Sequence, residues 1–201
     1  MVSILIGCLG FIITHTFDFV ALKRVKKLKP VVWFTGFGLI GYSLIDLFLK
    51  EPKILLPIWL NVIGWIFMPV GLLLQLFPIF INLPFKDTYI KHGINTHLIT
   101  NGFYSLTRHP GVMGFTILLP SLFFASGSKL LLIAVPIFYF FDLLVVWIQD
   151  VYFFPKMFPE YNEYRKLTPI FYPNKRSIKA FINNLRSYKG GQNNDFSTGT
   201  V

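Results

Sequence analysis

An arginine–histidine pair stands directly before an apolar segment near the middle of the chain. Arg108 and His109 precede Pro110, and no charged side chain follows until after Ser126. Proline suits the first position of a helix, where its missing N–H would have no partner. A helix N-terminus has free N–H groups and partial positive charge, so Arg108 placed there can hold a carboxylate or phosphate. His109 can bind a ligand or accept a proton.

A second polar pair, Gln149 and Asp150, follows the next apolar segment. The two apolar segments are separated near Ser128, where a turn is predicted. In an antiparallel helical hairpin, residues at equal distances from the turn face each other. Arg108 is 20 residues before Ser128, and Ile148, the residue before Gln149, is 20 residues after it. We therefore expect Arg108 and His109 to lie within about one helical turn of Gln149 and Asp150.

The elements that carry these residues are those of a membrane protein. Hydrophobic residues make up 54% of the 201-residue chain and charged residues only 14%, against ~25% charged in soluble domains. Apolar runs near the ~20 residues that cross a bilayer predict about five transmembrane helices in an all-α, polytopic fold. The predicted spans are Met1–Leu22, Pro30–Leu49, Ile54–Phe85, Pro110–Ser126 and Leu130–Phe154. The third run exceeds one span, so we expect it to be kinked near Pro69 or Pro78 and to continue along the interface.

The basic residues predict an orientation. Net charge is +10, but the charges lie in loops between apolar segments, which is typical of membrane topology rather than of nucleic-acid binding. Of the 19 lysines and arginines, all but Lys50, Lys53 and Lys129 fall on loops that five spans would place on one side. The positive-inside rule then puts the N-terminus outside or in a lumen, and the C-terminus and the polar pairs in the cytosol.

Other polar residues leave their roles open. With Cys8 as its single cysteine and four scattered histidines, the chain shows no metal-ligand spacing, and no metal site is expected. Arginine and tyrosine at an interface also serve as anchors, so Arg108 and the tyrosines at 104, 161, 164 and 172 have a purely structural alternative. Ionisable residues within or near spans are either functional or paired for helix packing. These are His15, Asp18, Asp46 and Asp142.

The C-terminal region has the pattern of an amphipathic helix. Between positions 175 and 189, apolar residues recur at helical spacing among basic ones, at Ile178, Phe181, Ile182 and Leu185. Such a helix lies on an anionic membrane leaflet or packs as a surface helix. The polar, glycine-rich residues from Gly190 onward are expected to be disordered.

Residues 98–114 resemble the central motif of the isoprenylcysteine carboxyl methyltransferase and phospholipid methyltransferase family. That motif reads Gly-Pro-Tyr-Arg-x-x-Arg-His-Pro-x-Tyr-x-Gly, and it is matched here by Gly102, Tyr104, Arg108, His109, Pro110 and Gly114. Phe103 replaces the family's proline, and Val112 its second tyrosine. After its last span the family has an acidic pair, then Phe-Gly-x-x-Tyr-x-x-Tyr, then prolines. The matching residues are Tyr161, Tyr164, Pro169 and Pro173, with Gln149 and Asp150 at the acidic pair and Met157-Phe158 at Phe-Gly.

The resemblance, which covers about residues 86–174, implies a membrane-embedded methyltransferase that uses S-adenosyl-L-methionine on a lipophilic or small apolar acceptor. It implies a cytosol-facing cofactor pocket and catalytic roles for Arg108 and His109. The cofactor-binding residues that it implies are His97, Leu98, Ile99, Tyr104, His109, Pro110, Gln149 and Asp150. The family's isoprenylcysteine branch grips its substrate carboxylate with an arginine near the position of Val145 here, so a prenylcysteine carboxylate is not favoured.

The chain then divides into N-terminal spans at 1–85, a methyltransferase-like region at 86–174, and an interfacial helix with a tail at 175–201. The expected partners are the bilayer and a lipophilic small molecule, with no nucleic acid and no obligate protein partner. Two alternatives stay open. Membrane sterol reductases resemble the same Arg-His-Pro segment and use NADPH, although they are longer and a phosphate cluster would need more arginines than Arg108. A degenerate, non-catalytic member of the family is the other.

Overall fold

The computed structural model describes residues 1–194 except 24, 26, 51 and 83–97. Within these residues the regular structure is entirely helical, apart from a single β-bridge between Lys53 and Ser128, which confirms the all-α prediction. In chain order the elements are α1 Val2–Leu22, α2 Leu28–Leu49, α3 Ile58–Phe77, the π-helix η1 Pro78–Asn82, α4 Phe103–Leu106, α5 Pro110–Ser126, α6 Lys129–Ile148, the π-helix η3 Gln149–Phe153, α7 Phe154–Met157, α8 Tyr161–Leu167 and α9 Lys175–Asn194.

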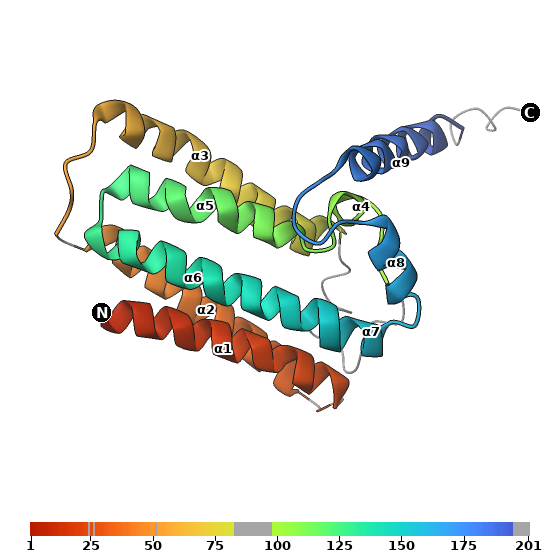
Figure 1. Ribbon diagram of the computed structural model, residues 1–201, viewed down its shortest axis with the longest axis horizontal. Helices are drawn as coiled ribbons and strands as arrows, with labels where there is room; N and C mark the ends of the chain where they lie inside the picture. The colour runs from red at the N-terminus through yellow and green to blue at the C-terminus, as the bar shows by residue number, and fades with distance from the viewer. Residues whose placement is uncertain (24, 26, 51, 83–97, 195–201) are drawn as a thin grey trace, which may run out of the picture.

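Four helical stretches of the described chain are long and apolar enough to cross a membrane, as a membrane protein requires. They are Val2–Leu22, Leu28–Leu49, Ile58–Asn82 and Lys129–Met157. The remaining predicted span, Pro110–Ser126, is an apolar helix of 17 residues. It runs alongside α3 and α6 in the same bundle (Figure 1).

The long helices run antiparallel to their neighbours in sequence, so one end of the bundle gathers most of the polar elements (Figure 1). At this end α1, α3 and α6 finish and α2 and α5 begin, and α4, α7, α8 and α9 lie beyond it. We call it the site end. It is the right-hand end in Figure 1, opposite the N-terminus.

Glycines set the closest helix contacts. A Cβ atom added at Gly64 or Gly71 of α3 would lie 2.3 Å and 2.5 Å from the backbone of α5, and one at Gly114 would lie 2.6 Å from the backbone of α3. Gly10 and Gly36 play the same part between α1 and α2, at 2.9 Å from a backbone atom of the opposite helix. Small residues allow such approach in membranes, where van der Waals packing holds helices together.

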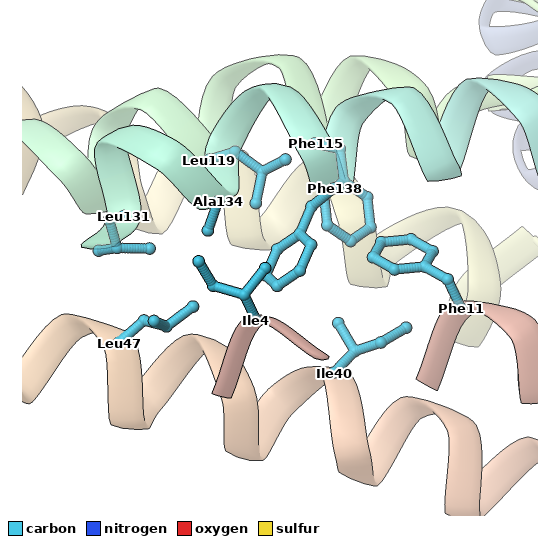
Figure 2. Close-up of a cluster of buried hydrophobic side chains, with 9 residues drawn as sticks. All are labelled: Ile4, Phe11, Ile40, Leu47, Phe115, Leu119, Leu131, Ala134 and Phe138. Carbon is cyan, nitrogen blue, oxygen red and sulfur yellow. The ribbon is translucent and has the colours of Figure 1, made fainter. Parts of the chain in front are cut away.

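The bundle core lies between α1, α2, α5 and α6 (Figure 2). Phe11 of α1 contacts two other rings of this core, with ring centroids 6.0 Å from Phe115 and 5.7 Å from Phe138. Phe138 is fully buried. The other members of this cluster are Ile4, Ile40, Leu47, Leu119, Leu131 and Ala134.

The predicted turn near Ser128 is confirmed. Gly127 adopts the left-handed conformation (φ 68°) that ends many helices, and the Ser128 hydroxyl caps the start of α6. The loop before α3 pairs with this turn, since Ile54 N–H donates to Gly127 O (2.7 Å) and Lys129 N–H donates to Pro52 O (3.1 Å). The hairpin of α5 and α6 is thereby fixed at the end opposite the site.

Several boundaries differ from the prediction. The helix α3 passes through Pro69 without interruption and changes to a π-helix at Pro78, and the rest of the expected run to Phe85 lies outside the described residues. The helix α2 begins at Leu28, so Lys29, which was assigned to a loop, is buried inside the bundle.

At the C-terminus, α9 continues to Asn194, past Gly190, where disorder was expected to begin. Its apolar face contacts α4, where the ring of Phe181 lies 5.7 Å from that of Phe103. Ile178, Ile182 and Leu185 remain exposed. This exposed apolar face is compatible with the predicted interfacial helix.

Candidate functional site

A cavity of about 300 Å³ lies at the site end and extends inward between the helices. Polar residues, among them Arg108, His109 and Tyr161, line its outer part. Its inner part reaches Phe11 and Phe115 of the hydrophobic core. A cavity of this size is at the lower end of the ~300–1,000 Å³ typical of ligand sites.

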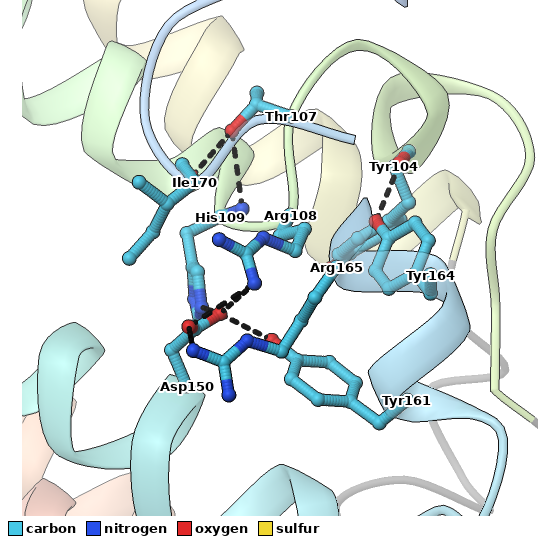
Figure 3. A network of polar contacts seen from close by, with 9 residues as sticks. All are labelled: Tyr104, Thr107, Arg108, His109, Asp150, Tyr161, Tyr164, Arg165 and Ile170. Atoms are coloured by element: carbon cyan, nitrogen blue, oxygen red, sulfur yellow. Dashed lines mark hydrogen bonds and ion pairs between the residues drawn. The ribbon is translucent and has the colours of Figure 1, made fainter. Parts of the chain in front are cut away.

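Asp150 is the centre of the polar contacts at this end (Figure 3). Arg108 Nη1 lies 2.8 Å from Asp150 Oδ1 and 3.1 Å from Oδ2. The Tyr161 hydroxyl donates to Oδ1 at 2.5 Å. His109 Nε2 lies 3.5 Å from Oδ1, and Arg165 Nη2 lies 3.5 Å from Oδ2. The contact between Arg108 and the π-helix η3 confirms the predicted meeting of the two hairpin ends.

The segment after α8 holds the backbone of the arginine–histidine pair. Arg108 N–H donates to Pro169 O at 2.9 Å, and His109 N–H donates to Ile170 O at 3.3 Å. The Thr107 hydroxyl donates to the same carbonyl, Ile170 O, at 2.7 Å. These bonds occupy backbone groups that precede the first turn of α5 and fix the direction in which both side chains leave the chain.

The two tyrosines of α8 fold back onto the site and are buried, which differs from an aromatic belt facing the interface. The hydroxyl of Tyr164 donates to Tyr104 O at 2.5 Å and joins α8 to α4. Burial raises the pKa of Tyr161, and the adjacent Asp150 carboxylate raises it further. Burial likewise raises the pKa of Tyr164. Both phenols therefore keep their protons and act as hydrogen-bond donors.

His109 is buried and held as a flat ring against Phe154, with centroids 5.5 Å apart and planes 8° apart. Burial lowers the pKa of His109; the nearby carboxylate of Asp150 opposes this shift, and the charge of Arg108 adds to it. The imidazole is therefore neutral near pH 7, and can accept one proton.

Gln149 belongs to a second polar group, which it forms with residues of α1 and α2. Its side-chain Nε2 donates to Asp18 Oδ2 of α1 at 2.9 Å. Asp18 also interacts electrostatically with Lys29 of α2, and both are buried. Gln149 and Asp150 are neighbours in sequence but serve different groups, because successive residues of a helix point in different directions.

Most residues singled out in the sequence come together at this cavity. Those that line it are Leu98, Ile99, Tyr104, Arg108, His109, Pro110 and Gln149. Asp150 does not line the cavity; it contacts Arg108 and His109 from behind. The guanidinium of Arg108, expected to hold a carboxylate of a ligand, already binds this one. His97 lies outside the described residues.

Four further residues with charged or amide side chains line the cavity and were not assigned to the site from the sequence. They are Asp18, Lys29, Gln75 and Asp142. The two aspartates had a detectable signal, since each is an ionisable residue inside an apolar run. Gln75 was one of three isolated amide residues in a long apolar run, with Asn61 and Asn82, and Lys29 was hidden among the lysines of a basic loop.

Comparison of the chain with models of protein families, with curated proteins and with solved structures finds no match in any of the three.

Proposed function

We propose that this protein is an integral membrane methyltransferase that uses S-adenosyl-L-methionine to methylate a lipophilic or small apolar acceptor. One observation carries the proposal. Arg108 and His109 of the first motif meet Asp150 and Tyr161 of the second, at the mouth of a cavity whose inner part reaches the hydrophobic core. Such a cavity has room for a charged cofactor at one end and an apolar acceptor at the other.

The cavity wall has groups that suit this cofactor. Arg108 Nε is buried without a hydrogen-bond partner, and His109 Nε2 has only its longer contact of 3.5 Å to Asp150 Oδ1; both residues line the cavity. The lining carries both signs of charge, with Lys29 and Arg108 against Asp18 and Asp142. Mixed charge fits a ligand that bears a carboxylate, an ammonium and a sulfonium.

The protein's own contribution is positioning, because S-adenosylmethionine supplies the activated methyl group. Asp150 holds the guanidinium of Arg108 in one orientation, which leaves its Nε directed away from the ion pair. The stacked ring of Phe154 fixes the plane of His109. The neutral imidazole binds the cofactor, or takes a proton from an acceptor that must be deprotonated.

We further propose that the site end faces the cytosol and that the N-terminus lies outside or in a lumen. The support is the distribution of lysine and arginine, most of which fall in connections at the site end and in the C-terminal region.

Binding of the cofactor product tests the proposal. Purified protein in detergent is heated with S-adenosylhomocysteine or with NADPH, and the unfolding temperature is recorded. We expect S-adenosylhomocysteine to stabilise the protein by ~2.7 kcal/mol at a hundredfold excess over its Kd. Stabilisation by NADPH instead would favour the reductase alternative, and stabilisation by neither would favour a non-catalytic protein.

Variants locate the site, and a labelling reaction identifies the acceptor. His109→Ala should abolish stabilisation by S-adenosylhomocysteine, while Glu163→Gln, an exposed change on α8, should leave it unchanged. Incubation of the protein with a lipid extract and a radiolabelled methyl donor, followed by chromatography, should give a labelled apolar product. A fully active His109→Ala protein would contradict the site assignment.

A further inference from the structure

Two buried side-chain oxygens within the described part of the chain have no hydrogen-bond partner, Gln75 Oε1 and Asp142 Oδ2. Both residues line the cavity. A buried acceptor left without a donor is costly, and more so when it can carry charge in an apolar helix. Their coincidence in one cavity indicates that a donor group of a ligand completes them.

These oxygens lie farther inside the bundle than the contacts of Asp150. Asp142 of α6 precedes Asp150 of η3 by about two helical turns, or ~12 Å. It is one turn from Phe138, whose ring contacts that of Phe11 in the bundle core. Along the chain Asp142 therefore lies closer to the cluster of Figure 2 than to the outer polar group of Figure 3.

Gln75 reaches the cavity across the face of α5. Its side-chain oxygen would lie 2.8 Å from a Cβ atom at Gly114, and the same oxygen lies 3.5 Å from one at Gly111. The absence of side chains at these two positions leaves the space that the amide occupies. Gln75 thus approaches from α3 and Asp142 from α6, on two different walls of the cavity.

The other carboxylates near the cavity already have partners. Asp18 accepts from Gln149, and Asp150 binds Arg108 and Tyr161. Asp142 and Gln75 therefore define a separate inner arm of the cavity, whose further lining includes Phe11, Phe37 and Phe115.

We propose that this inner arm binds the amino group of an apolar amine, whose N–H groups donate to Asp142 Oδ2 and Gln75 Oε1. Two acceptors on different walls need a head group with at least two N–H donors, which a primary amine has and a single hydroxyl lacks. The aromatic rings suit an ammonium and its alkyl chain. That the bound amine is also the methyl acceptor rests on the proposed function, whereas its binding does not.

A ligand series on the wild-type protein tests the inner arm directly. Isothermal titration in detergent would compare a long-chain primary alkylamine with the alcohol and the trimethylammonium salt of the same chain length. The amine should bind at least about tenfold more tightly than either, because only the amine can donate to both oxygens. Equal binding of the amine and the trimethylammonium salt would overturn the proposal, since the latter has the charge but no donor.

Variants then assign the preference to its residues. Asp142→Asn and Gln75→Leu should each reduce the preference for the amine to within about threefold, and Glu163→Gln should retain it in full. A preference retained in Asp142→Asn would also overturn the proposal. If a variant fails to fold, the wild-type series alone decides. Stabilisation by S-adenosylhomocysteine without an amine preference would refute amine binding in the inner arm and leave the methyltransferase proposal intact. An amine preference without stabilisation by S-adenosylhomocysteine would support amine binding and contradict the methyltransferase proposal.

Discussion

Neutralising Asp150 is the sharpest test of how the site end is held together. Asp150→Asn keeps the shape of the side chain but removes the charge that faces Arg108 at 2.8 Å. The Asp150 side chain is 2% exposed and that of Arg108 is 9% exposed, so the arginine would be left buried without its counter-ion. Breaking a buried pair on one side costs ~3–5 kcal/mol. The second arginine contact, to Arg165 at 3.5 Å, is 36% exposed on the arginine side and adds little.

The free energy of unfolding would be measured by titration with a denaturing detergent, with tryptophan fluorescence as the signal. We expect Asp150→Asn to lower it by ~3–5 kcal/mol. Glu163→Gln breaks an exposed pair with Lys166 and should lower it by no more than ~1 kcal/mol.

A double-mutant cycle separates the pair from other effects. Arg108→Met added to Asp150→Asn removes the unpaired charge, so the double variant should be less destabilised than the sum of the two single variants. Additive losses, or a loss below ~1 kcal/mol for Asp150→Asn, would refute the interpretation that this ion pair holds the two hairpin ends together.

Three further outcomes follow from the packing and the protonation states. Gly114→Ala should destabilise the protein by ~1–3 kcal/mol in the same titration, because its Cβ would collide with the backbone of α3. The matched change Gly38→Ala, where a Cβ has open space, should stabilise it by ~0.5–1 kcal/mol. Tyr161→Phe should cost ~1.5–3 kcal/mol through the lost hydrogen bond to Asp150, and a neutral result would mean that the bond contributes nothing. Because burial holds the pKa of His109 below its usual 6.5, the unfolded state binds more protons as pH falls below that value. The stability is therefore present above pH 6.5 and is lost as pH falls toward the folded pKa, and His109→Gln should flatten this dependence in titrations from pH 7.5 to 5.

Spacing alone was enough to predict the hairpin. The distances of Arg108 and Asp150 from Ser128 are nearly equal, and a helix converts residue number into length at a fixed rise. For this reason the contact between them could be expected before the structure. The apolar runs likewise indicated the long helices, since their lengths match a bilayer.

The rotation of each helix about its own axis could not be predicted from the sequence. Gln149 donates to Asp18 of α1. Which helix packs beside α6 decides this partner, and no local sequence pattern encodes that packing. Lys29 resembles the loop lysines that precede it, although it lies in the first turn of α2 and is buried. The position of the unpartnered Gln75 oxygen depends on the space that Gly114 leaves on α5, and therefore on how α3 and α5 pack together.

The two π-helices have a consequence for how the chain tolerates changes in length. Both η1 and η3 lie at the site end, where they finish long α-helices that are otherwise regular. A π turn closes its hydrogen bond one residue later than an α turn, so it accommodates one additional residue without lengthening the helix in proportion. Removing a single residue between Gln149 and Phe153 would therefore convert that turn to the ordinary α-helical pitch and leave the helix beyond it nearly in place, whereas the same deletion in a regular α-helix rotates everything beyond it by ~100°. The phenol of Tyr161 would then keep its contact with the carboxylate, provided that the residue removed is not Asp150 itself.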